Sequence, residues 1–163
     1  MGISIVSIAA KMPDWVEVGC EEYSRRLSKE YSLNWIDVAP EVRAKTRSID
    51  KIKQIETQKL LKAVPERSLA IVLDERGQLR SSAAFAKRLE GWLEQSSHVS
   101  FLIGGADGMS PDLKQIAGAQ KVQIGETLAI SPLTFPHPLV RVILAEQLYR
   151  AWSINHGHPY HRE

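Results

Sequence analysis

The sequence holds a single cysteine, Cys20, among its 163 residues. One cysteine cannot form a disulfide within the chain, and such sparse use of cysteine is typical of a reducing compartment. No apolar run approaches the ~18 residues that a membrane-spanning helix requires. The apolar opening ISIVSIAA lacks the basic stretch of a signal peptide, and it is better interpreted as a strand. We therefore expect a cytoplasmic protein without a membrane segment.

Two common kinds of ligand site are also missing. The stretch AAKMPDW after the first apolar run contains no glycine, which disfavours the phosphate-binding turn of a dinucleotide enzyme. The glycines of GGADG are not followed by the Gly-Lys-Ser/Thr of a P-loop. His156, His158 and His161 lie close together, but Pro159 prevents a regular helix there and no cysteine or carboxylate stands at a recognised ligand spacing. We expect no metal site.

The totals describe an ordinary globular chain without an excess of either charge. Apolar residues make up 44% and charged residues 25%, and the net charge is +2. The length predicts one domain over residues 1–163. Charge is nevertheless uneven, because residues 41–53 carry five basic and two acidic side chains, whereas residues 1–40 carry four basic and six acidic ones. The result is a local basic patch on a nearly neutral protein.

Apolar patterning predicts an alternation of strands and helices. Five apolar runs predict strands over residues 3–9, 32–38, 69–73, 99–103 and 122–130. Helices are predicted between them, with Ser48 as one N-cap, Ser81 or Ser82 as another, and a last helix from Pro138 to about Asn155. Continuous apolar strands are typical of strands covered on both faces. The pattern predicts an α/β fold with a mainly parallel sheet and helices on both faces.

Three loops that follow predicted strands could bind a ligand. In parallel α/β sheets, ligands bind beyond the carboxyl ends of the strands, and these ends carry LDERG, LIGGADG and ISPLTFPHP. Adjacent glycines in the second loop allow a ligand to approach the backbone closely, although an ordinary turn explains them equally well. Three prolines stiffen the third loop, which has few charges. Such a loop suits an adenine ring, or it is a rigid connector to the last helix.

The last predicted helix, over residues 138–155, is apolar nearly all round. A helix of this kind must be buried on more than one side. Its own sheet supplies one side, and a second copy of the chain is the economical partner for the other. The pattern therefore favours a homodimer over a central helix within a monomer.

Long stretches of the sequence together resemble one known family. They are KMPDWVEVGCEEYSRR, LIGGADGMSP and LTFPHPLVRVILAEQLYRAWSINHGHPYHRE, whereas residues 42–69 are the least distinctive part. The chain resembles the RlmH family of bacterial ribosomal large-subunit RNA methyltransferases, of the SPOUT class. This resemblance implies an α/β fold with a C-terminal trefoil knot and S-adenosylmethionine as methyl donor. It also implies methylation of N3 of a pseudouridine in a 23S ribosomal RNA hairpin loop on assembled ribosomes, by a homodimer whose sites are each completed by the other protomer.

Carried over by position, the resemblance implies a cofactor site in the three loops described above. The residues are Leu73, Gly104, Gly105, Ile130, Ser131, Pro132, Leu133, Thr134 and Phe135. Pro132 and Phe135 depart from the smaller or aliphatic residues typical of the family, which affects adenine packing more than backbone contacts. The basic patch is then interpreted as a contact for RNA phosphates through Arg43, Lys45 and Arg47, with His158 also at the RNA, and a solvated loop is the alternative.

Methylation at N3 displaces a proton, so a proton acceptor or a group that stabilises the deprotonated base is expected. The candidate acceptors are His161, His158, His137 and Glu146, and the candidate stabilisers are Arg141 and Arg162. We predict that His161 and Arg162 act on the substrate while Tyr160 positions it or stacks on it, so that the tail HPYHRE closes over the target base. Which histidine takes the proton stays open. A ribosome-binding factor without catalysis is the alternative function.

Overall fold

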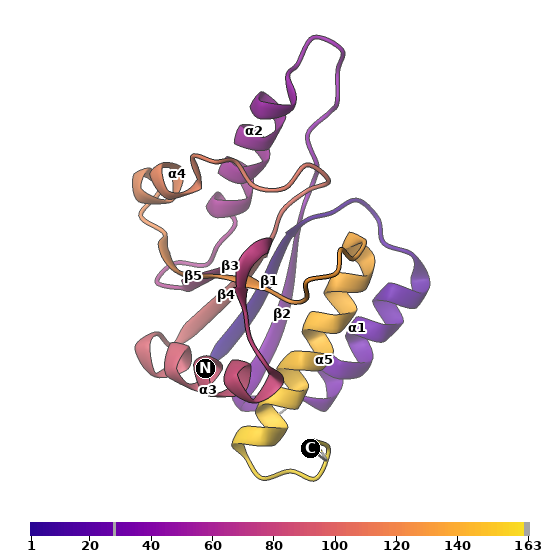
Figure 1. The fold of residues 1–163 in the computed structure, drawn as a ribbon, viewed down its shortest axis with the longest axis vertical. Coiled ribbons are helices and arrows are strands. Elements are labelled where there is room, and N and C mark those ends of the chain that lie inside the picture. The colour runs from indigo at the N-terminus through magenta and orange to yellow at the C-terminus, as the bar shows by residue number, and fades with distance from the viewer. Residues whose placement is uncertain (28, 162–163) are drawn as a thin grey trace.

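The computed structural model describes residues 1–27 and 29–161, and a five-stranded sheet lies at its centre (Figure 1). The strands are β1 (Gly2–Ile8), β2 (Ser32–Val38), β3 (Leu69–Leu79), β4 (His98–Ile103) and β5 (Gln123–Ala129). Their order across the sheet is β2-β1-β4-β3-β5, and each neighbouring pair is parallel. The predicted α/β class and the parallel sheet are confirmed.

Helices cover both faces of this sheet, as predicted. They are α1 (Asp14–Arg26), α2 (Ile49–Lys62), α3 (Ser82–Gln95), α4 (Leu113–Ala119) and α5 (His137–Asn155), with a short 3-10 turn at Lys29–Tyr31. Ile5 belongs to the buried cluster that includes Leu148 of α5 and Leu89 of α3, whereas its neighbour Val6 belongs to the cluster with Leu60 of α2. Successive strand residues point to opposite faces, so α3 and α5 lie on one face and α2 on the other.

The helix starts follow the predicted capping. The side chain of Ser48 accepts a hydrogen bond from the Lys51 backbone N–H, and that of Ser81 accepts one from Ala84. These bonds satisfy backbone donors that the first helical turn leaves without partners. None of the helices in the described part of the chain is both long and apolar enough to cross a bilayer.

Strand β3 is longer than predicted. The apolar run predicted a strand ending at Leu73, but β3 continues through the polar residues to Leu79. Leu73 and Gln78 both pair with Leu128 of β5, so the four residues between them leave the regular ladder. Gly77 passes so close to β5 that a Cβ on it would lie 2.7 Å from the carbonyl carbon of Leu128. Only glycine allows this approach of two backbones.

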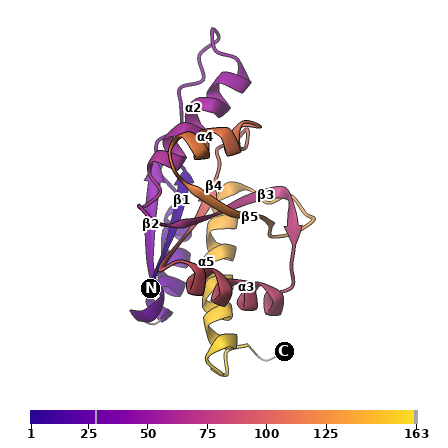
Figure 2. The same ribbon diagram turned by 90° about the vertical axis from the view of Figure 1, so that its left-hand side faces the viewer.

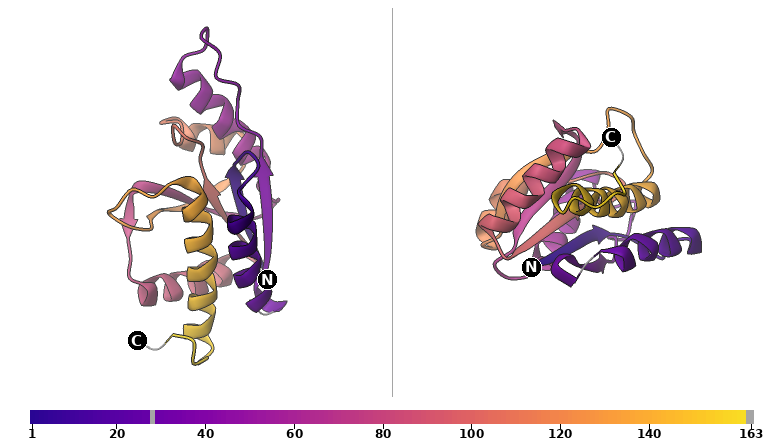
Figure 3. Two further views of the ribbon diagram at one scale, coloured as in Figure 1. Left: turned by 90° about the vertical axis from the view of Figure 1, so that its right-hand side faces the viewer. Right: turned by 90° about the horizontal axis from the view of Figure 1, so that it is seen from below.

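Helix α5 lies between α1 and α3, as Figure 3 shows in the view from below. Its inner face packs on the sheet, and a Cβ on Gly19 of α1 would lie only 3.3 Å from Val142 of α5. Two helices of its own chain thus flank α5. The large apolar side chains with high exposure, such as Trp15 and Val18 of α1, lie elsewhere. The apolar pattern of α5 alone therefore does not require a second chain.

Candidate active site

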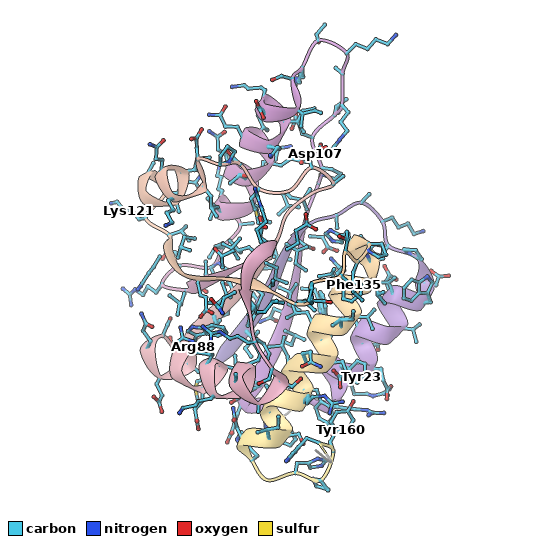
Figure 4. The ribbon with its side chains drawn as sticks, viewed as in Figure 1. Tyr23, Arg88, Asp107, Lys121, Phe135 and Tyr160 are labelled. Carbon is cyan, nitrogen blue, oxygen red and sulfur yellow. The ribbon has the colours of Figure 1, made fainter. Side chains whose placement is uncertain are left out.

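A cleft of about 680 Å³ opens at the middle of β3, where its pairing with β5 shifts register, and beyond the carboxyl ends of β4 and β5. A cavity of this size suits a ligand of nucleoside dimensions. The three segments singled out in the sequence meet here, and the predicted cofactor residues in the lining are Leu73, Gly104, Gly105, Ile130, Ser131, Leu133, Thr134 and Phe135. Of the predicted cofactor residues, Pro132 alone is not part of this lining. Figure 4 shows Phe135 beside the N-terminal half of α5.

The loop over residues 104–108 forms one wall of the cleft and has a tight backbone. The N–H of Gly108 donates to the carbonyl of Gly105 at 3.0 Å, and Gly108 has a φ of +82°, which favours glycine. A Cβ on Gly104 would lie 3.2 Å from the Gly108 carbonyl carbon and 3.3 Å from Sδ of Met109. A side chain at position 104 would therefore press against the loop's own backbone and against Met109.

The loop over residues 130–136 forms the facing wall. The hydroxyl of Thr134 donates to Oε2 of Glu75 at 3.2 Å, which ties this loop to β3. The backbone N–H of Leu133 donates to Oγ of Ser131 at 3.0 Å. The Leu133 side chain is 69% exposed at the rim, and Phe135 is half-buried. Together they present apolar surface to a flat ring.

Charged side chains in the cleft were missed by the sequence analysis. They are Lys53, Asp74, Glu75, Arg76 and Asp107. Asp74 to Arg76 directly follow the buried part of β3, which is a usable signal in the sequence. Lys53 is on α2, and no residue near it in the sequence indicates the cleft. No group of three or more potential metal ligands occurs within the described ranges.

His137 begins α5 and also lines the cleft. Burial and the nearby Arg141 charge lower its pKa, while a hydrogen bond with the backbone of Gly104 acts in the opposite direction. Its Nε2 is buried and has no hydrogen-bond partner among the residues described. An imidazole that stays neutral at physiological pH can accept a proton.

Arg141 lies in the interior, which disagrees with its predicted contact with the substrate. It is only 5% exposed, and its guanidinium donates to the Ser7 hydroxyl and, at 2.8 Å, to Oδ1 of Asp37. The same group lies 4.8 Å from the ring centre of Trp35. A guanidinium that is ion-paired and enclosed in this way holds α5 to β1 and β2, and it is not available to a ligand in the cleft.

The tail packs on the C-terminal half of α5. The Tyr160 hydroxyl donates to Oε1 of Glu146 at 3.0 Å, and its ring centre lies 4.6 Å from that of Tyr149. Burial, and secondarily the Glu146 carboxylate, raise the pKa of Tyr160 well above its usual value. The phenol therefore stays protonated. Figure 4 shows Tyr160 close to Tyr23 of α1, near the C-terminal end of α5.

The other predicted tail residues gather at the same place. Nδ1 of His161 lies 3.0 Å from Oγ of Ser153, and that hydroxyl donates to the carbonyl of His158 at 2.9 Å. Arg162 lies outside the described residues. None of the described tail residues lines the cleft. Between Val140, which lines it, and Ser153, which holds the tail, the helix rises about 20 Å. One chain thus carries two separate groups of predicted site residues.

The basic patch projects from the body on the loop before α2 (Figure 2). Its charge is partly neutralised by the chain's own carboxylates, because Arg43 pairs with Asp107 at 2.8 Å and Arg47 pairs with Glu41. Hydrogen bonds from Lys59 and from Arg47 lower the pKa of Glu41, which keeps it ionised. Lys45 has no ion-pair partner within the part of the chain described here.

Comparison with known proteins agrees with this combination of cleft and tail. The profile of the family described as "Predicted SPOUT methyltransferase" matches residues 1–161. Proteins called ribosomal RNA large subunit methyltransferase H from Paraburkholderia phymatum and Burkholderia cenocepacia are each 42% identical over 162 residues. The protein of that name from Ralstonia pickettii is 41% identical over the same length. Each alignment covers 99% of both chains, so the likeness includes the cleft loops as well as the tail.

Proposed function

The chain belongs to the SPOUT methyltransferase family, and on this basis we propose that it methylates 23S ribosomal RNA with S-adenosylmethionine as the donor. The proposed target is N3 of a pseudouridine in a hairpin loop, methylated on assembled ribosomes in the cytoplasm. The convergence of three loops on one cleft of about 680 Å³ is the observation that carries the proposal. We also propose that the chain has the C-terminal trefoil knot that the family resemblance implies.

The residues of the cleft fit such a donor. Leu133 and Phe135 offer apolar surface to its adenine ring. Carboxylates such as Asp74 and Glu75 suit its cationic groups, and Lys53 suits its carboxylate. The glycine loop over residues 104–108 allows a close backbone approach, because it carries no side chain at three of its five positions.

The chain's own residues would align the RNA and manage the proton of N3. S-adenosylmethionine supplies an activated methyl group, so the protein contributes mainly orientation. Tyr160 is unsuited to accept the proton because its raised pKa keeps it neutral, and it is better suited to donate a hydrogen bond or to stack on a base. The candidate acceptors remain His137 in the cleft, and His158, His161 and Glu146 at the tail.

We further propose that the chain works as a homodimer. In one chain none of the tail residues that the structure describes lines the cleft, so a site with both parts requires the tail of a second copy. The isologous contact of a two-fold dimer would create two such sites.

Mass spectrometry of 23S ribosomal RNA from cells with and without this protein tests the proposal. We expect one methylated pseudouridine to disappear when the protein is absent and to return with the wild-type gene. Calorimetry should show that the purified protein binds S-adenosylmethionine. If it bound ribosomes but not S-adenosylmethionine at millimolar concentration, the non-catalytic ribosome-binding factor would be the better description.

A further inference from the structure

Arg43 connects two loops that lie far apart in the sequence. It belongs to the projecting segment between β2 and α2 (Figure 2), and its Nη2 lies 2.8 Å from Oδ2 of Asp107, 64 positions later. Asp107 is part of the 104–108 loop and lines the cleft, and Figure 4 shows it beside this segment. Arg43 does not itself line the cleft. It therefore holds one wall of the cleft from outside.

A buried carboxylate lies behind the same wall. Glu56 of α2 is 1% exposed, and its Oε2 accepts a hydrogen bond from the Glu41 backbone N–H at 3.0 Å. Its Oε1 has no hydrogen-bond partner within the described ranges and lies 3.6 Å from Nη2 of Arg43, close enough for charge attraction. A Cβ on Gly105 would lie 2.6 Å from that Oε1. The carboxylate thus supports the backbone of the loop directly.

The guanidinium of Arg43 is the counter-charge of this carboxylate. A buried carboxylate is costly unless it is paired, because it loses its water without a replacement. Arg43 interacts with Glu56 and Asp107 at once, one behind the 104–108 loop and the other on it. Both contacts are made by Nη2 of Arg43, and a lysine, whose shorter side chain ends in one compact ammonium, would not place its charge at the same point.

We propose that Arg43 is a positioning residue for the methyl donor, because it fixes the 104–108 loop so that the cleft is formed before RNA binds. The inference rests on the proposed function, since it takes S-adenosylmethionine as the ligand of the cleft. It replaces the predicted phosphate contact of Arg43 with a role inside the protein. Lys45 remains a proposed contact for RNA phosphates.

Removal of the guanidinium frees Asp107 and leaves Glu56 without its counter-charge. The 104–108 loop then samples more conformations, and the ligand must order the loop as it binds, which lowers affinity. We expect Arg43→Gln to weaken S-adenosylmethionine binding about three- to tenfold. Lys45 lies on the same segment but makes no such bridge. Lys45→Gln removes its charge and should therefore leave the affinity for S-adenosylmethionine unchanged.

The test is calorimetry of S-adenosylmethionine binding to the full chain without RNA, for wild type and for Arg43→Gln, Arg43→Lys and Lys45→Gln. Arg43→Lys keeps a charge near Glu56 but loses the bridge, so we expect an intermediate affinity. In a background of Asp107→Asn, the loss caused by Arg43→Gln should shrink, because the partner is already gone. In turnover with ribosomal RNA, Arg43→Gln should raise KM for the donor and change kcat little.

The outcomes separate the inference from the function on which it rests. If the wild-type chain does not bind S-adenosylmethionine, the proposed function fails. If the wild type binds and Arg43→Gln binds equally well, the positioning role is refuted. An undiminished loss in the Asp107→Asn background would also refute it. Thermal unfolding of each variant shows that the folded chain is being measured, and Arg43→Lys serves where Arg43→Gln does not fold.

Discussion

At the scale of single residues, Arg141 is expected to act on stability. Its guanidinium, which is buried, donates to both Ser7 and Asp37. We predict that Arg141→Gln lowers the free energy of unfolding by about 2 kcal/mol. The loss stays below that of a fully buried pair because Asp37 is half exposed and water can solvate it. Urea denaturation measures the change.

The matched control is Arg25, whose side chain is 68% exposed in its ion pair with Glu22. Exposed pairs contribute little, so Arg25→Gln should change the free energy of unfolding by less than about 0.5 kcal/mol. If both variants lowered the free energy of unfolding equally, the burial of Arg141 would not explain its contribution to stability.

His137 should make stability depend on pH. Burial lowers its folded pKa below the ordinary value of 6.5, so the folded state favours the neutral ring. Its contribution is fully present above pH 6.5 and is lost as the pH falls from there through the folded pKa, because the unfolded chain takes up the proton first. We predict that the free energy of unfolding declines below pH 6.5 and that His137→Gln removes part of the decline. Denaturation curves over a pH series measure both.

Another histidine provides the comparison for this pH series. Burial also lowers the pKa of His98, next to Ser4 at the other end of the sheet. His98→Gln should therefore remove a further share of the same decline. An unchanged pH dependence in His137→Gln would contradict the assignment to His137.

At the scale of elements, the close approach of the parallel strands β3 and β5 depends on Gly77. A Cβ there would lie 2.7 Å from the Leu128 backbone, which cannot move without shifting β5. We predict that Gly77→Ala lowers the free energy of unfolding by about 1–3 kcal/mol. Gly91 is the control, since it lies in α3 and a Cβ on it would have nothing within 4 Å. Gly91→Ala should raise the free energy of unfolding by about 0.5–1 kcal/mol. If both variants lowered it by similar amounts, the close approach at Gly77 would not be the cause.

The pairing of β3 with β5 also shows which elements could not be predicted from the sequence. Both ends of β2 and the caps Ser48 and Ser81 were predictable, because each depends on residues next to it. The continuation of β3 past Leu73 was not, since its polar residues lack an apolar period and their conformation is imposed by β5. Sequence patterns thus predict an element when interactions between nearby residues determine it, and they miss one that a distant strand imposes.

The candidate site divides in the same way. The three loops could be placed together from the sequence because parallel strands end at one edge of a sheet. The contact of Arg43 with Asp107 could not, because it spans 64 positions. The burial of Arg141 was missed for another reason: α5 is apolar nearly all round, so its sequence does not show which face meets the sheet.

At the scale of the whole molecule, the separation of cleft and tail predicts an assembly. The tail is held by Glu146 and Ser153 of its own chain, whereas the cleft lies at the other end of α5. If both act on one RNA base, they must come from different chains. Sedimentation should then show a particle of about twice 18.3 kDa.

Mixing two defective chains tests whether the site is shared. Gly104→Val should disable the cleft, because its side chain collides with Gly108 and Met109, and Tyr160→Ala should disable the tail while leaving donor affinity intact. Each variant alone should be inactive. After subunit exchange in equal amounts, half of the dimers are mixed, and each mixed dimer has one site with an intact cleft and an intact tail, so roughly a quarter of wild-type activity should return. If cleft and tail of one chain formed the site, no dimer in the mixture would hold an intact site, and the mixture would stay inactive.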